Sequence, residues 1–146
     1  MYAFLVDHSP ATPAVGYRFE YAGNVVVITG DTKKTDTLAG FAAGADILVG
    51  NVLAFDLAGQ TVDSLTRLGM EREANMLNDT LDYHLDAVHV GEVAQEAGAG
   101  KVVLTHVVPP APQILDRVFI DGVKEAYSGE VIMGEDGMFF SLDPKD

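Results

Sequence analysis

The sequence predicts an α/β (α+β) fold in which one mixed β-sheet carries helices on one face. Two observations predict this class. Short apolar or alternating segments, typical of strands, occur along the whole chain, and between them lie segments whose apolar residues recur at helical spacing. The chain has 146 residues, of which 48% are apolar, and this size fits a single domain over residues 1–146 without an internal boundary.

The first third of the chain predicts three strands, a helix and a further strand. Residues 2–6 (YAFLV) and 15–29 are typical of strands, and the second segment is broken at Ala22-Gly23-Asn24, where the residue types favour a tight hairpin. Residues 35–43 are typical of a helix with Leu38 and Phe41 on one side, and the apolar run 45–49 indicates a buried strand.

The remainder predicts helices separated by strands. Residues 61–81 indicate two short helices that break at Gly69, and Asp86 is the predicted N-cap of a helix that closes at Gly98, before a strand at 101–104. Pro112 can open a further helix that ends near Gly129, followed by strands near 130–133 and 138–141. The apolar stripe predicted for that helix consists of Ile114, Leu115, Val118, Phe119, Gly122, Val123 and Ala126.

Composition excludes several classes of function. The chain has no cysteine, so disulfides, thiolate metal sites and a cysteine nucleophile are excluded, and a transition-metal site would need His, Asp and Glu. Nine Lys and Arg against 22 Asp and Glu give a net charge of -13, which repels polyanions and weighs against nucleic acid as a partner. The first ten residues are apolar but too few for a signal peptide or a membrane span, so we expect a cytoplasmic protein without a membrane partner.

Three candidate metal ligands, His8, Asp31 and His106, each lie within two residues of the end of a predicted strand. Sheet sites form at strand ends, and this ligand set suits zinc, iron or manganese, with Gly30 permitting close approach to an ion. In the alternative interpretation, both histidines hydrogen-bond to backbone and Asp31 caps the helix predicted near Thr35. The residue pattern leaves both interpretations open. It also leaves open a third, in which the chain is a small acidic binding module unrelated to metals.

Two long segments carry a resemblance to a known family. HSPATPAVGYRFEYAGNVVVITGDT (residues 8–32) and YHLDAVHVGEVAQEAGAGKVVLTHVVPP (residues 83–110) resemble the second half of the metallo-β-lactamase superfamily, in its arylsulfatase-like and ribonuclease Z-like branches. The segment GVKEAYSGEVIMGEDGMFFSLDP matches the usual ending, so the resemblance covers nearly the whole chain. It implies half of an αββα sandwich and the C-terminal half of a metal-dependent hydrolase, which would act on a small phosphoester, sulfate ester or similar ester.

The resemblance also implies roles for individual residues. His8 corresponds to a ligand of the first metal, Asp31 to the carboxylate that bridges two metals, and His106 to a ligand of the second metal. His84 corresponds to an auxiliary catalytic histidine that stabilises the transition state or donates a proton. The implied cofactor is a divalent metal, zinc, with two ions in a complete family site. His89 is expected on the solvent side of the following helix and is not a candidate.

The chain departs from the family at three places. The first metal motif of the family, HxHxDH, does not occur in it, so the resemblance implies an N-terminal half-domain as partner, and this chain alone is expected to bind divalent metal weakly or not at all. Leu85 and Asp86 replace the usual small hydroxyl residues. VVPPAPQ follows His106 in place of a Ser-x-Arg-Tyr-like sequence, and no basic arm is present, which favours the arylsulfatase-like branch.

An alternative to the enzyme is a non-catalytic, stand-alone half-domain. The strand segments YAFLV, NVVVIT, DILVG and KVVL are apolar on both faces, whereas the helices of the chain suffice for one face. An uncovered face would require a partner, either the missing half or a second copy of the chain.

We therefore predict a homodimer or higher oligomer of the isolated chain, joined sheet to sheet. Sedimentation velocity at micromolar concentration is expected to show a species of at least twice the 15.5 kDa chain mass. A monomer at every concentration would show that the chain covers its own sheet.

Overall fold

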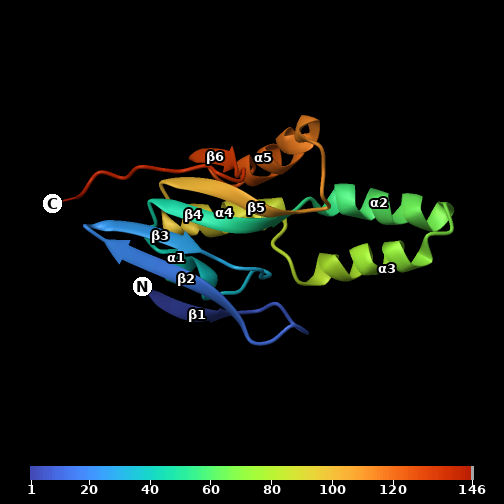
Figure 1. Cartoon of the computed structure of the whole chain (residues 1–146), viewed down its shortest axis with the longest axis horizontal. Coiled ribbons are helices and arrows are strands. Elements are labelled where there is room, and N and C mark those ends of the chain that lie inside the picture. Colours follow the sequence, from blue (N-terminus) through green and yellow to red (C-terminus); the bar gives the residue numbers. More distant parts are fainter. Residues whose placement is uncertain (146) are drawn as a thin grey trace.

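The computed structural model describes residues 1–145 and confirms the predicted class: one mixed six-stranded sheet with helices packed on it (Figure 1). The strands lie side by side in chain order, and β1, β2 and β3 are antiparallel neighbours whereas β3, β4, β5 and β6 run parallel. Their bounds are β1 Tyr2–Val6, β2 Ala14–Tyr21, β3 Asn24–Ile28, β4 Ile47–Leu53, β5 Lys101–Val108 and β6 Glu130–Met133.

The β2–β3 hairpin lies where the turn residues predict it. Ala22 and Gly23 join the strands with φ of 48° and 75°. Two consecutive positive φ angles give the turn twist that matches paired antiparallel strands, and glycine adopts this conformation without steric cost. The hairpin brings β3 back parallel to β1, so that the carboxyl ends of both strands lie at the same edge of the sheet.

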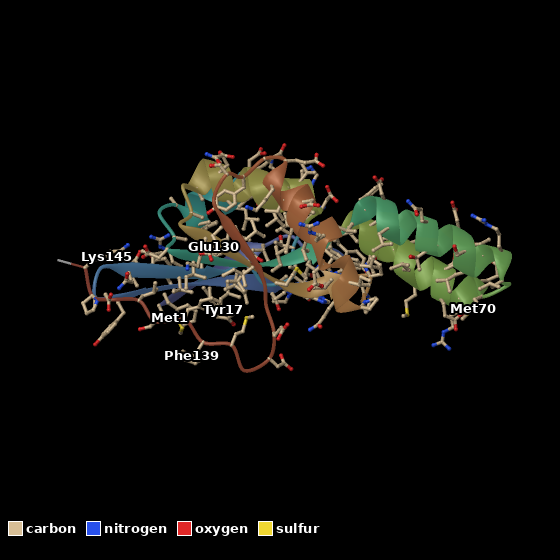
Figure 2. All side chains as sticks on the ribbon, turned by 90° about the horizontal axis from the view of Figure 1, so that it is seen from above. Met1, Tyr17, Met70, Glu130, Phe139 and Lys145 are labelled. Carbon is tan, nitrogen blue, oxygen red and sulfur yellow. The ribbon has the colours of Figure 1, made fainter. Side chains whose placement is uncertain are left out.

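Three helices cover one face of the sheet (Figure 2). They are α1 (Leu38–Ala42), α4 (Ala87–Ala97) and α5 (Asp116–Lys124), and their apolar side chains form the main core with the sheet. Helix α1 is shorter than the predicted 35–43. The preceding loop is held in a non-helical path by the bond from Lys33 N to the Asp7 carbonyl, and Arg18 donates to the carbonyls of Phe41 and Ala43 at the end of the helix.

A helical hairpin projects beyond the end of the sheet (Figure 1). It consists of α2 (Phe55–Arg67) and α3 (Glu71–Asp79), which separate at Gly69 (φ 74°) as predicted, although α2 begins six residues earlier than position 61. A small apolar cluster joins the base of the hairpin to β4 and β5. The short 3₁₀ helix η1 (Thr80–Asp82) then leads the chain back to the sheet.

The sheet face opposite the helices, called here the helix-free face, is apolar and partly exposed. By strand register, Leu5, Tyr17, Phe19 and Tyr21 lie on it, and they are 72%, 39%, 37% and 87% exposed. Ile47 and Val103 share this face and are buried. The C-terminal segment that includes Phe139 runs along the side of the sheet away from the helices (Figure 2).

Two predictions about the end of the chain are wrong. Residues 138–141 do not form a strand, because after Gly137 (φ 89°) the chain crosses the helix-free face, and Lys145 N donates to the Ala22 carbonyl while Asn24 Nδ2 donates to that of Asp143. Pro112 opens the 3₁₀ helix η2 (Gln113–Leu115) first, whose tighter turn rotates Ile114 out of the apolar stripe to the solvent. The following α5 ends at Lys124 rather than near Gly129, and Val118 is exposed.

Among residues 1–145, no helix has the length and apolar character needed to cross a membrane.

The contact between α4 and α5 yields a prediction for stability. A Cβ added at Gly91 would lie 2.2 Å from the Val123 carbonyl oxygen, so Gly91→Ala is expected to lower the free energy of unfolding by about 1–3 kcal/mol. Gly59→Ala on α2 is the matched control, since no heavy atom lies within 4 Å there, and we expect it to be neutral or stabilising by up to about 1 kcal/mol. Urea denaturation followed by circular dichroism measures both variants, and equal effects would contradict the described packing.

Candidate functional site

The carboxyl ends of β1, β3 and β5 meet at one edge of the sheet and bring three predicted residues together. Asp31 Oδ2 lies 3.1 Å from His106 Nε2. Donor atoms of His8, Asp31 and His84 all lie within 4.8 Å of one another. The predicted convergence of His8, Asp31 and His106 is thus confirmed, whereas their roles as metal ligands stay a prediction.

His84 completes a cluster of four residues. It follows η1 and reaches the sheet edge from the side of the helical hairpin, with its ring edge-on to those of His8 and His106 at centroid distances of 5.2 and 5.1 Å. His84 Nε2 is buried and has no hydrogen-bond partner among residues 1–145. Burial lowers the pKa of His84, and the nearby His106 and His8 lower it further, against the opposing effect of the Thr80 carbonyl, so the neutral imidazole is favoured.

Backbone carbonyls set the tautomers of two histidines. His8 Nδ1 lies 3.0 Å from the Tyr83 carbonyl oxygen, and His84 Nδ1 lies 3.0 Å from that of Thr80. Because a carbonyl oxygen only accepts, each neutral ring carries its proton on Nδ1 and leaves a lone pair on Nε2. Metal-binding histidines are oriented in this way, so the alternative interpretation of a backbone-bonded His8 is compatible with a ligand role.

A β-bulge directs His106 toward Asp31. Asn51 of β4 pairs with Thr105 and the next residue, Val52, pairs with Val107, so His106 has no partner in the register. Its φ is 44°, in the left-handed region that residues other than glycine seldom adopt. Bulges and such backbone outliers are frequent beside functional sites, where they redirect a side chain.

The loop after β3 explains Gly30 and corrects one expectation. At Gly30 (φ 66°) an added Cβ would lie 2.4 Å from the Val15 carbonyl oxygen, so the close contact of this glycine is with β2, and the approach of an ion there stays a prediction. Asp31 does not cap a helix near Thr35, since α1 begins at Leu38 after Thr37. The carboxylate of Asp31 is free for the cluster.

Buried polar residues tie the strand ends together beneath the cluster. Thr32 is fully buried, and its hydroxyl shares one proton between the carbonyl oxygens of Lys33 and Asp7, which lie 2.8 and 3.2 Å from Oγ1. Asn51 Nδ2 donates to the Thr32 carbonyl at 3.2 Å. These bonds connect Asp7, Thr32 and Asn51. Asp7 precedes His8, Thr32 follows Asp31, and Asn51 lies in β4, which pairs with β5 beside His106. The bonds therefore hold three of the four cluster segments in place.

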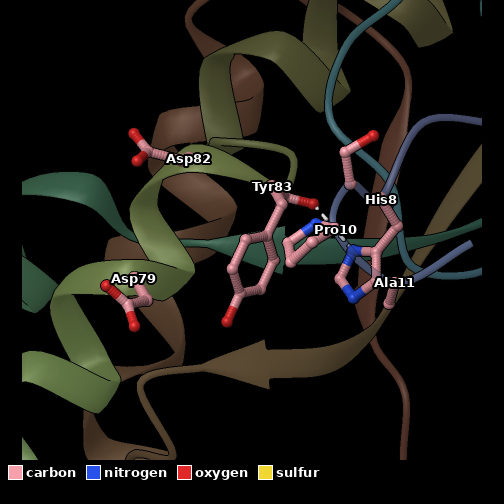
Figure 3. A pocket seen from close by; sticks show the side chains of 7 residues that line it. His8, Pro10, Ala11, Asp79, Asp82 and Tyr83 are labelled. Carbon is pink, nitrogen blue, oxygen red and sulfur yellow. Dashed lines mark hydrogen bonds between the residues drawn. The ribbon is translucent and has the colours of Figure 1, made fainter.

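His8 of the cluster also lines a cavity of about 400 Å³, whose lining residues are drawn in Figure 3. The rest of the lining comes from the loop after β1 and from the end of the helical hairpin. Sequence reasoning missed these residues, although Tyr83 immediately precedes His84. The other lining residues are Ser9, Pro10, Ala11, Asp79, Asp82 and Tyr83.

The donor set fits a divalent metal. Two ligands of one ion with bonds of about 2.1 Å can be no more than about 4.2 Å apart, so shifts well under 1 Å would let donors within 4.8 Å of one another share an ion. Two imidazole nitrogens and a carboxylate oxygen suit zinc, manganese or iron. The unpartnered Nε2 of His84 supports this fit, because a buried nitrogen without a partner is costly unless something binds it.

Comparison with known proteins gives sequence relatives over most of the chain. No family model matches it. The ribonuclease Z of Mycobacterium tuberculosis (strain H37Rv) is 34% identical over 130 residues, 89% of this chain and 44% of that protein. The ribonuclease Z of Mycolicibacterium gilvum is 40% identical over 103 residues, 70% of this chain and 32% of that protein. The chain spans about half the length, or less, of the curated relatives it matches.

Solved structures agree on the fold. The metallo-β-lactamase fold protein YhfI from Bacillus subtilis matches 93% of this chain and 47% of its own with a TM-score of 0.67 at 23% identity. The chain is similar to the ribonuclease Z-like branch of the metallo-β-lactamase superfamily. The short form of human tRNase Z also matches, over 97% of this chain and 41% of its own, with a TM-score of 0.59 at 20% identity. The metallo-β-lactamase fold half predicted from the sequence is therefore shown.

The comparisons favour the ribonuclease Z-like branch over the arylsulfatase-like branch that the residues after His106 favoured. In this structure the sequence after His106 is the end of β5 and a Pro109-Pro110 turn that leads away from the sheet. The sequence that stands in place of the Ser-x-Arg-Tyr-like pattern therefore covers the last two residues of β5 and the segment after it, and His106 still lies within β5.

The buried network yields a testable difference between two threonines. Thr32→Val deletes a buried hydroxyl and leaves the Asp7 and Lys33 carbonyls without it, so we expect a loss of about 1–3 kcal/mol in the free energy of unfolding. Thr66→Val is the control: its hydroxyl makes a comparable bond to the Val62 carbonyl but is exposed, and a change within about 0.5 kcal/mol is expected. Thermal denaturation of both variants measures the difference. Similar losses would mean that the network does not hold the strand ends.

Proposed function

We propose that this chain supplies one half of a divalent-metal-dependent hydrolase that cleaves phosphodiester bonds in RNA. The observation that carries the proposal is the cluster of His8, Asp31, His84 and His106, with a buried, unpartnered Nε2 among its donors. The class of substrate comes from the relatives, which are ribonucleases Z by name, and from the similarity of fold to a tRNase Z. RNA as the proposed substrate replaces the small ester expected from the sequence, and it revises the expectation that nucleic acid is not a partner.

In this proposal zinc is the metal, and His8 and His106 serve different ions. Asp31 supports such an arrangement, since its carboxylate lies at 3.1 Å from His106 and within 4.8 Å of the donors of His8 and His84. When bound, the ions supply Lewis-acid polarisation of a phosphoryl oxygen and a hydroxide nucleophile near neutral pH. Asp31 contributes the negative charge that holds two cations close together.

His84 moves a proton in the proposed reaction. Its neutral state, fixed Nδ1–H and free Nε2 allow it to accept a proton at Nε2 and then to deliver that proton to the leaving oxygen of the RNA. A ligand role for His84 is the competing assignment, because it is one of the three residues whose donor atoms lie within 4.8 Å of one another. Metal affinity and activity of a His84 variant separate the two roles.

The remaining ligands come, in this proposal, from a partner half-domain that carries HxHxDH and packs on the helix-free face. The exposed Tyr17, Phe19 and Tyr21 support a partner there, as does the share of the relatives' length that this chain spans. A second copy of the chain is the competing occupant, and it corresponds to the non-catalytic alternative.

Co-expression with a half-domain carrying HxHxDH tests the proposal. We expect the purified complex to cleave an RNA that contains a tRNA sequence and to hold two zinc ions, whereas the chain alone neither cleaves nor retains stoichiometric zinc through chelator-free purification. His84→Ala is expected to lower cleavage by about 100-fold or more while zinc content stays the same. Asp31→Ala is expected to lower both.

His89→Ala is the matched control, because His89 is exposed on α4 outside the cluster, and we expect no change in cleavage or zinc content. Loss of zinc from the His84→Ala complex would show that His84 is a zinc ligand. A complex with full zinc and no cleavage of RNA would overturn the proposed substrate, and zinc retained by the chain alone would show that it holds an independent metal site.

A further inference from the structure

The cavity beside His8 has the features of a binding site for a flat aromatic group. Its volume of about 400 Å³ lies in the range of small-molecule sites. Tyr83 forms one wall, with its ring edge-on to that of His8 at a centroid distance of 4.8 Å, and Pro10 and Ala11 supply apolar surface. Aromatic side chains in such positions stack on nucleobases in RNA-binding proteins.

Two carboxylates in the lining of the cavity, those of Asp79 and Asp82, are acceptors without partners among the described residues. Figure 3 shows the Asp79 carboxylate on the same side of the cavity as the Tyr83 hydroxyl, with His8 on the opposite side. Within residues 1–145, the carboxylates of Asp79 and Asp82 take part in no ion pair and accept no hydrogen bond. Ionised carboxylates accept hydrogen bonds and repel other acceptors, so they select a ligand with N–H groups at its edge.

The place of the cavity fixes what part of a substrate would enter it. His8 lines the cavity and also contributes a donor atom to the cluster, so a group in the cavity is next to the bond that the proposed function cleaves. A phosphate is excluded by two carboxylates. The neighbouring base of the same RNA strand is uncharged and has the flat shape that Tyr83 can stack on.

We propose that this cavity is a nucleobase subsite that prefers bases with an exocyclic amino group. The inference rests on the proposed function for the class of substrate. Tyr83 stacks on the base, and Asp79 accepts a hydrogen bond from the amino group. Cytosine, adenine and guanine offer such a donor, whereas uracil presents a carbonyl oxygen at the position where cytosine has its amino group.

Cytidine and uridine form a pair of probes of similar size, since cytosine has an amino group at C4 and an acceptor at N3 where uracil has a carbonyl oxygen and an N–H, and neither needs metal or cleavage to bind. Chemical-shift titration of the ¹⁵N-labelled chain is expected to show saturable binding of cytidine with shifts at His8 and Tyr83, and binding of uridine weaker by about tenfold. Asp79→Asn is expected to remove most of this difference. Asp63→Asn changes the net charge equally on the exposed face of α2 and is expected to leave the difference unchanged.

The variants separate recognition from folding. Tyr83→Ala is expected to weaken both nucleosides alike, and the unchanged spectrum of the main core would show that each variant is folded. Equal affinity for the two nucleosides, shifts located elsewhere, or no saturable binding would overturn the subsite. These outcomes are independent of the cleavage assay. RNA cleavage without a base preference would support the proposed function and overturn the nucleobase subsite. A base preference without RNA cleavage would support the subsite and overturn the proposed function.

Discussion

The geometry of the candidate site depends on the buried hydrogen bonds of Thr32. Its hydroxyl and carbonyl connect the end of β1, the loop after β3, and Asn51 of β4. Asp31 precedes Thr32 and His8 follows Asp7, so the bonds of their chain neighbours help to position both residues, beside the contacts of His8 Nδ1 with the Tyr83 carbonyl and of Asp31 with His106. Because the His8 ring is held through Nδ1, its Nε2 is available for a ligand.

Strand β4 connects the other two histidines to the cluster. Asn51 belongs to the strand that pairs with β5, and the register shifts at the next residue, which leaves His106 unpaired beside Asp31. His84 arrives from the opposite side, after the helical hairpin, where the bridge between Leu53 and Asp86 returns the chain to the end of β4. The helical hairpin thus connects two neighbouring positions at the edge of the sheet. Its last residues form the wall of the cavity next to His8.

The sequence was informative where local chemistry decides structure. Turn residues placed the β2–β3 hairpin, and Gly69 and Gly98 marked helix ends that the structure shows with positive φ. Strand-end positions led to His8, Asp31 and His106 because strands of one direction share an edge. Long-range contacts were not predictable: the Val15 carbonyl requires Gly30, the bulge sets His106, and the cavity wall forms from segments about 70 residues apart. Asp86 illustrates both cases. It immediately precedes α4, as its residue type predicts, whereas the hydrogen bond that its carboxylate accepts from Phe55 N of α2 is a long-range contact that the sequence does not predict.

The charge of the chain sets a condition on the proposed reaction. The chain has nine Lys and Arg, and within the described residues 1–145 five of them form ion pairs with carboxylates: Arg18, Lys33, Lys34, Lys101 and Lys145. Two divalent ions would add four positive charges to a chain of net charge -13 and would not reverse the repulsion of an RNA backbone. Approach of RNA therefore requires positive charge from the partner half-domain, close enough to the sheet edge to act within a Debye length of about 10 Å. The helix-free face satisfies this requirement, because strands that carry the cluster at their ends also carry that face, and a partner packed on it borders the cluster directly.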